Sequence, residues 1–180
     1  MSEIVYQTLK AEKLNETLDD LASILHGCVQ NGASVSFIHP FSKEDARSFW
    51  LKDVFPKVEK GETVLLVARA DDRLVGTVQL QTNLPPNQTH RCEVAKLLVH
   101  PDYRKRGIAT TLMENLEEEA RALGKSLITL DTRSGDQAEP LYILLDYKIA
   151  GRIPNFARAA DCDRLDSTTY MYKILEQTDL

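Results

Sequence analysis

The segment 96–109 limits the fold of this chain more than any other part of it. An apolar run ending at Val99 is followed by a turn with three basic residues and Gly107, and then by apolar residues at helical spacing. This pattern predicts a strand, a tight turn and a helix that begins at the turn. The free backbone N–H groups and positive dipole end of such a helix attract phosphate, Gly107 leaves room for a close approach, and Arg104 and Arg106 add charge. We therefore expect a phosphate-binding turn here.

The remaining elements follow from apolar periodicity, turn residues and capping signals, including a capping box formed by Ser42 and Asp45. The predicted helices are Leu14 to Gln30, Ser42 toward Val58, Gly107 to Leu123, and Ala138 to Leu145. The predicted strands are Ile4 to Leu9, Val64 to Ala70, Leu74 to Leu80, Glu93 to Val99, Leu127 to Leu130, Lys148 to Ile153, and Thr169 to Ile174. A βαβ crossover from Glu93 to Asp131 implies a mixed sheet with helices on its faces, an α/β (mixed α+β) fold.

Length and composition narrow the class of protein. The chain has 180 residues, which suits one domain spanning 1–180. Lys and Arg number 22 against 27 Asp and Glu, so the net charge of −5 disfavours nucleic acid as a partner. No membrane span or signal peptide is expected, and the odd cysteines Cys28, Cys92 and Cys162 disfavour a disulfide framework or metal site. We expect a cytoplasmic protein without a metal.

Three motifs in order carry a family resemblance. The segment 104–109, Arg-Lys-Arg-Gly-Ile-Ala, resembles the Arg-x-x-Gly-x-Ala acyl-CoA motif of the GNAT (Gcn5-related N-acetyltransferase) superfamily. The segment 97–101 resembles the strand that precedes this motif, and the segments 138–142 and 145–147 resemble the family's A-x-x-L-Y-x-x-L-G-Y/F helix. The resemblance extends over nearly the whole chain. It implies the GNAT fold, a mixed six- to seven-stranded sheet flanked by about four helices.

Further segments are similar to the tabtoxin resistance protein and its relatives, a group that acetylates an amino group of a β-lactam dipeptide toxin. They are residues 32–37, 93–97, 130–132, 151–156 and 163–165. The chain also departs from the family pattern at two positions. Gly135 stands where an asparagine that contacts the cofactor is common, and Asp146 replaces the glycine before the final aromatic residue, so we expect a different turn there.

The resemblance implies acetyl-CoA as co-substrate. Its pyrophosphate would lie at the basic turn, and its pantetheine would lie between two splayed parallel strands, paired with the backbone of Leu98 and Val99. The implied cofactor-binding residues are Leu97, Leu98, Val99, Arg104, Lys105, Arg106, Gly107, Ile108, Ala109 and Thr110. The alternative for the basic run is an ordinary solvated turn.

The resemblance places the phenol of Tyr142 near the sulfur of CoA. A phenol pKa near 10 would suit proton donation to the leaving thiolate, although Tyr142 could instead be a core residue. Glu93 and Asp131 could orient the acceptor amine or take its proton through water. They could equally be ordinary strand-end charges, with Glu93 paired to Arg91 or Lys96.

Other residues are weaker candidates for a functional role. We expect His100 to be structural, whereas His90, which follows the loop with two prolines, could face the substrate. Cys92 has no Cys/His/Asn arrangement around it, which favours direct transfer without an acyl-enzyme. The segment 32–41 with Trp50 could line the acceptor side or belong to the core.

The resemblance, together with these residues, implies an N-acetyltransferase that moves an acetyl group from acetyl-CoA to a primary amine of a small molecule, by direct attack in a ternary complex. A toxin, an antibiotic or an amino-acid-like compound is the expected acceptor. The alternatives are acetylation of a protein N-terminus or lysine, and a non-catalytic acyl-CoA-binding sensor. The resemblance also allows a homodimer.

Overall fold

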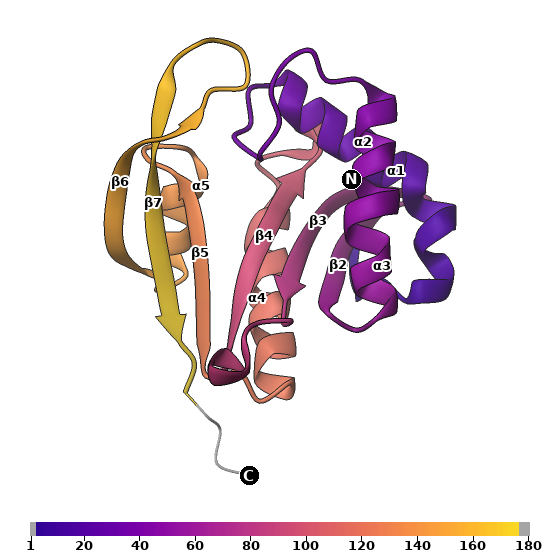
Figure 1. Ribbon diagram of the computed structural model, residues 1–180. Helices are drawn as coiled ribbons and strands as arrows, with labels where there is room; N and C mark the ends of the chain where they lie inside the picture. The colour runs from indigo at the N-terminus through magenta and orange to yellow at the C-terminus, as the bar shows by residue number, and fades with distance from the viewer. Residues whose placement is uncertain (1–2, 177–180) are drawn as a thin grey trace.

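Within residues 3–176, which the computed structural model describes, seven strands form one mixed sheet in the order β1-β2-β3-β4-β5-β7-β6 (Figure 1). The strands are β1 (Ile4–Thr8), β2 (Thr63–Ala70), β3 (Arg73–Gln81), β4 (Arg91–Val99), β5 (Leu127–Arg133), β6 (Lys148–Arg158) and β7 (Leu165–Ile174). The neighbours β4 and β5 run parallel, and all other neighbouring pairs are antiparallel. The predicted mixed sheet is confirmed.

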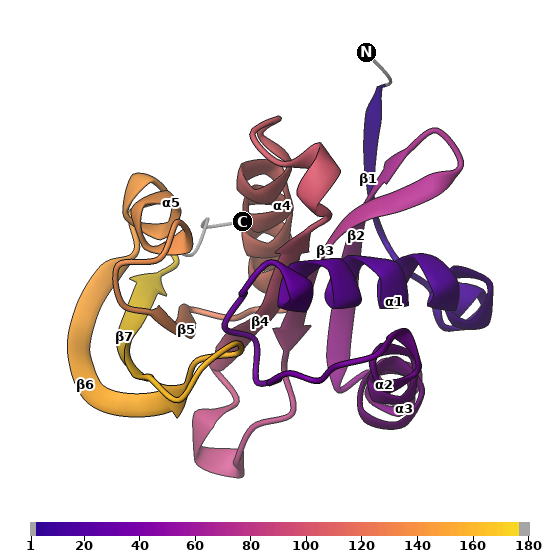
Figure 2. The same ribbon diagram turned by 90° about the horizontal axis from the view of Figure 1, so that it is seen from above.

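Four helical units in the same residues cover the two faces of the sheet (Figure 2). They are α1 (Leu14–Gln30), α2 with α3 (Lys43–Phe49 and Phe55–Glu59), α4 (Ile108–Ala122) and α5 (Ala138–Leu144). The first two units lie on one face and α4 and α5 on the other, so each face has its own apolar core. A Cβ on Gly76 of β3 would lie 3.0 Å from Ile108 Cγ2, so a glycine lets α4 pack closely on the sheet.

The helix predicted from Ser42 toward Val58 is not one regular α-helix. Residues 50–54 form a π-helical turn in which the Phe55 N–H donates to the carbonyl of Trp50. Pro56 has no N–H to donate to the carbonyl four residues earlier, which accounts for the interrupted hydrogen-bond ladder at this point. The capping box itself is present, because the Ser42 hydroxyl accepts from the Asp45 N–H and the Asp45 carboxylate accepts from the Ser42 N–H.

This capping box gives a first prediction. We expect Ser42→Ala to lower the free energy of unfolding by about 1 kcal/mol, because the side chain that satisfies the Asp45 N–H is removed. Urea denaturation measures the change, and Ser48→Ala within the same helix is the control. An equal loss in both variants would contradict the capping role.

The closing strands are longer than predicted. β6 continues to Arg158 through Pro154, where the prediction ended at Ile153, and β7 begins at Leu165 and not at Thr169. As the last strand in the sheet order, β6 is exposed along nearly all of its length and tolerates a proline, so neither alternation nor composition marks its true end.

The parallel pair β4–β5 separates along its length. The two strands are in register only from Arg91 opposite Leu127 to Glu93 opposite Thr129. Beyond this point β4 carries a bulge against β3, where Lys96 adopts φ 50° and the register shifts by one residue. The expected splay of the two strands is confirmed, and the bulge lies in the part of β4 that has left β5.

No helix among the described residues is long and apolar enough to cross a membrane.

Candidate functional site

A cavity of about 560 Å³ lies where β4 and β5 separate. Its walls come from β4, the turn before α4, the loop between α1 and α2, the end of β5, and α5. The lining includes residues 94–99, 104–105, 107–110, 33–36, 131–133 and Tyr142. The parallel strands therefore open directly into the cavity, and the N-terminus of α4 forms part of its wall.

The basic turn presents a helix N-terminus to this cavity. Gly107 is the N-cap of α4 with φ 77°, a conformation that glycine adopts without strain. A Cβ built on Gly107 meets no described atom within 4 Å, so the space beside its backbone is open. The turn thus combines free N–H groups with open space beside them, as anion binding at a helix N-terminus requires.

The charges of the turn divide between two roles. Arg104 and Lys105 line the cavity, and in residues 3–176 neither has a carboxylate within 4 Å. Arg104 donates from Nε to the carbonyl of Val99 over 3.3 Å, which holds its guanidinium against β4. Arg106 does not line the cavity and packs 4.8 Å from the ring centre of Tyr103. Every predicted cofactor-binding residue except Arg106 therefore contributes to the cavity wall.

Tyr142 on α5 lines the same cavity and belongs to the apolar core on the α4 and α5 face of the sheet. Its side chain is buried, at 5% exposure, and its hydroxyl has no hydrogen-bond partner among the described residues. Burial, and then the charges of Asp131 and Asp136, raise the pKa of Tyr142 well above its usual value. The expectation of a pKa near 10 is therefore wrong. The phenol stays protonated throughout the neutral range and is available as a hydrogen-bond donor.

The two acidic candidates lie in different surroundings. Asp131 is exposed, lines the cavity, and accepts a hydrogen bond from the Thr168 hydroxyl over 2.9 Å. Glu93 stands where β4 and β5 still pair and does not line the cavity. Its carboxylate accepts from Arg91 Nη1 over 2.6 Å, as one of the alternatives predicted. Only Asp131 faces the cavity directly.

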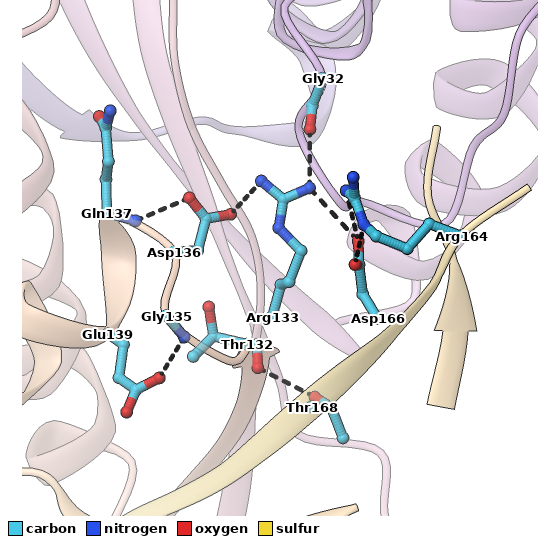
Figure 3. Close-up of polar contacts among 10 residues, drawn as sticks. All are labelled: Gly32, Thr132, Arg133, Gly135, Asp136, Gln137, Glu139, Arg164, Asp166 and Thr168. Atoms are coloured by element: carbon cyan, nitrogen blue, oxygen red, sulfur yellow. Dashed lines mark hydrogen bonds and ion pairs between the residues drawn. The ribbon is translucent and has the colours of Figure 1, made fainter. Parts of the chain in front are cut away.

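Arg133 organises a cluster that sequence reasoning missed (Figure 3). Its guanidinium donates to the carbonyl of Gly32 over 3.1 Å and pairs with Asp136 at 3.1 Å and Asp166 at 3.7 Å. Asp166 is also held by Arg164 at 2.6 Å. The cluster ties the loop after α1 to the end of β5 and the start of β7. Only the i,i+3 spacing of Arg133 and Asp136 is visible in the sequence, whereas the other contacts are long-range.

The two departures from the family pattern have local explanations. Gly135 has φ 74°, and its N–H donates to Glu139 Oε2 over 2.8 Å at the start of α5. Asp146 has φ 65°, which lies in the left-handed region that a glycine favours. Aspartate tolerates this conformation better than most residues do, so Asp146 is compatible with the turn that this chain forms.

The remaining candidates either have a structural role or line the cavity wall. His100 Nδ1 accepts from the Asp102 N–H over 3.3 Å, in agreement with a structural role. His90 does not line the cavity. Cys92 is fully buried, and burial raises its pKa to about 11, so it carries no thiolate for nucleophilic attack at neutral pH. Trp50 belongs to the core, whereas residues 33–36 line the cavity, so each alternative for this region holds for part of it.

The described residues contain no group of three or more histidine, cysteine, aspartate or glutamate side chains placed to hold a metal ion.

Comparisons with known proteins agree with this geometry. Residues 28–145 match the family described as Acetyltransferase (GNAT) family. An uncharacterized N-acetyltransferase from Azospirillum brasilense is 28% identical over 142 residues, which cover 78% of this chain and 82% of that protein.

Solved structures share the fold. An N-acetyltransferase from Staphylococcus aureus Mu50 superposes with a TM-score of 0.79 at 20% identity, covering 97% of this chain and 100% of that one. A putative acetyltransferase from Salmonella typhimurium, solved with its cofactor acetyl-CoA, has a TM-score of 0.76 at 15% identity, covering 99% and 98% of the two chains. With the family match over residues 28–145, the chain belongs to the GNAT family and is an acetyl-CoA-dependent N-acetyltransferase.

Proposed function

We propose that this enzyme acetylates a primary amine of a small molecule, with acetyl-CoA held in the cavity between β4 and β5. The observation that carries the proposal is one continuous cavity of about 560 Å³ that contains an unpaired basic turn, two open strand edges, a protonated phenol and a carboxylate. The pyrophosphate of CoA would bind at the turn that contains Gly107. The pantetheine would follow the part of β4 that has left β5.

The reaction needs a neutral amine, a stabilised oxyanion and a proton or hydrogen bond for the leaving thiolate. In the proposed mechanism, the amine nitrogen attacks the thioester carbon directly, and the C–S bond breaks as the tetrahedral intermediate collapses. A main-chain N–H near Leu98 polarises the carbonyl. Tyr142 donates to the departing sulfur, and Asp131 binds the amine and draws its proton toward solvent.

We retain Glu93 in the proposal as a more distant acid. Its side chain is 40% exposed and lies two residues along β4 from Arg91, so it could pass a proton only through water. The 2.6 Å ion pair with Arg91 occupies this carboxylate and supports a positioning or relay role over direct contact with the amine.

The difference between the two acids is testable. We expect Asp131→Asn to lower kcat/KM for the amine by about 10-fold or more, because the carboxylate that faces the cavity is lost. Glu93→Gln should have a smaller effect. Steady-state kinetics with a saturating acetyl-CoA concentration measure both, and a larger loss in Glu93→Gln would contradict the assignment of Asp131 as the nearer acid.

A screen of amines with a thiol-release assay tests the proposed function itself. Small primary amines, peptides with free N-termini, and lysine-containing peptides are supplied separately with acetyl-CoA. The proposal predicts release of CoA with at least one small amine at a higher kcat/KM than with any peptide. Efficient use of peptides alone would favour the protein acetyltransferase, and binding of acetyl-CoA without release in any series would favour the sensor.

A further inference from the structure

Lys96 is aimed into the cavity by the bulge of β4. Its backbone has φ 50°, which is uncommon for a residue other than glycine, and it lines the cavity together with Ser36. The ammonium donates to the Ser36 hydroxyl over 3.2 Å. It also lies 5.7 Å from the ring centres of both Phe37 and Phe49. A strained backbone position and three contacts therefore hold this charge at one place.

The charge of Lys96 has no counterion there. Between residues 3 and 176, no carboxylate lies within 4 Å of its ammonium. Arg133, which lines the same cavity, differs because Asp136 and Asp166 neutralise it (Figure 3). Burial lowers the pKa of Lys96, and the more distant charge of Asp131 partly opposes that change. A sheltered cation without a partner carries a desolvation cost that an anionic ligand would relieve.

The location of Lys96 indicates that its anionic partner would be a group of the acceptor and not a phosphate of CoA. Arg104 and Lys105 line the cavity just before the N-terminus of α4, where the phosphates are proposed to bind. Lys96 instead contacts Ser36 and Phe37 of the loop after α1, and Phe49 of α2. Asp131 lines the same cavity, and its negative charge opposes the lowering of the Lys96 pKa by burial. A cation and an anion thus face one space, as recognition of a zwitterion requires.

We propose that Lys96 binds a carboxylate of the acceptor, so that the substrate is an amine that also carries a carboxylate, as amino acids do. This inference rests on the proposed function, because it assumes that a small amine occupies the cavity beside acetyl-CoA. In this arrangement, Lys96 takes the carboxylate and Asp131 faces the amino group. The two contacts fix the orientation in which the nitrogen reaches the thioester.

Matched acceptor pairs test the inference. Free L-amino acids and the corresponding L-amino acid amides are compared as acceptors for the wild type, Lys96→Met and Lys96→Arg. We expect the wild type to favour the carboxylate form, and Lys96→Met to reduce that preference by about 10- to 100-fold, mainly through KM, because a charge-assisted hydrogen bond is lost. Lys96→Arg should restore part of it. Comparing the preference between variants cancels the different basicity of the two amines.

Two controls distinguish a loss of acceptor preference from a loss of folding or of acetyl-CoA binding. The thermal midpoint and the acetyl-CoA dissociation constant of Lys96→Met show whether the variant folds and binds its cofactor, and the wild-type preference needs no variant at all. Equal use of acids and amides by the wild type, or an equal loss for both in Lys96→Met, would overturn the inference and leave the proposed function standing. Acetylation of Lys96 itself, found by mass spectrometry, would also overturn it. No CoA release with any amine would instead refute the proposed function.

Discussion

Replacing Tyr142 by phenylalanine is expected to lower kcat by about 10²- to 10⁴-fold, the range typical of losing a general acid. The ring and its packing remain, and only the hydroxyl of this cavity-lining residue is removed. Burial raises the pKa of Tyr142, so the phenol keeps its proton and acts as a hydrogen-bond donor to the leaving thiolate, and the replacement leaves the sulfur without this donor. The acetyl-CoA dissociation constant should change by no more than a few-fold, since the phosphates bind elsewhere.

Tyr147→Phe is the matched control for this experiment. Tyr147 is also buried, and its ring lies 5.8 Å from that of Tyr142, but it does not line the cavity. We expect its replacement to leave kcat within a few-fold of the wild type. Weakened acetyl-CoA binding with unchanged turnover in Tyr142→Phe would refute the proposed role of the phenol, as would equal losses in the two variants.

Gly107→Val is expected to weaken acetyl-CoA binding by at least about 100-fold. The added side chain would occupy the open space beside the N-terminus of α4, where the pyrophosphate is proposed to approach the main chain. The φ of 77° is also unfavourable for a β-branched residue, so the turn itself would shift. Isothermal titration calorimetry with acetyl-CoA measures the effect.

A glycine just after the other end of α4 also has a positive φ and provides a control. Gly124 has φ 68°, and a Cβ there likewise meets no described atom within 4 Å, but it does not line the cavity. Gly124→Val should lose stability to a similar extent and keep its affinity for acetyl-CoA. Normal affinity in Gly107→Val, or an equal loss in Gly124→Val, would contradict the assignment of the phosphate-binding turn.

Local signals were enough to predict most of the fold. The periodicity of α1 gave its bounds, Leu14–Gln30, and Ser42 with Asp45 marked the start of α2. The glycine at position 107 marked the start of α4. The errors occurred where tertiary context decides. The π-helical turn depends on how Pro56 is accommodated, and the extent of β6 depends on pairing with β7, which its composition does not reveal.

The candidate site was predictable in its cofactor half and less so in its acceptor half. The turn at Gly107 and Tyr142 each lie in a contiguous motif, and the family resemblance carried by these motifs implied that the two lie at one site. The charge of Lys96 could not be placed, because its direction depends on a bulge produced by the register with β3. The contacts of Arg133 with the Gly32 carbonyl and with Asp166 could not be predicted either, because both residues lie far from it in the sequence.

Binding of acetyl-CoA in the cavity between β4 and β5 can be measured by thermal unfolding with and without this ligand. At a ligand concentration 100 times the dissociation constant, binding to the folded state alone adds about 2.7 kcal/mol of stability. For a chain of this size that corresponds to an increase in Tm of roughly 5 to 10 °C. We expect such an increase for the wild type and little or none for Gly107→Val. An unchanged Tm of the wild type at millimolar acetyl-CoA would contradict this expectation.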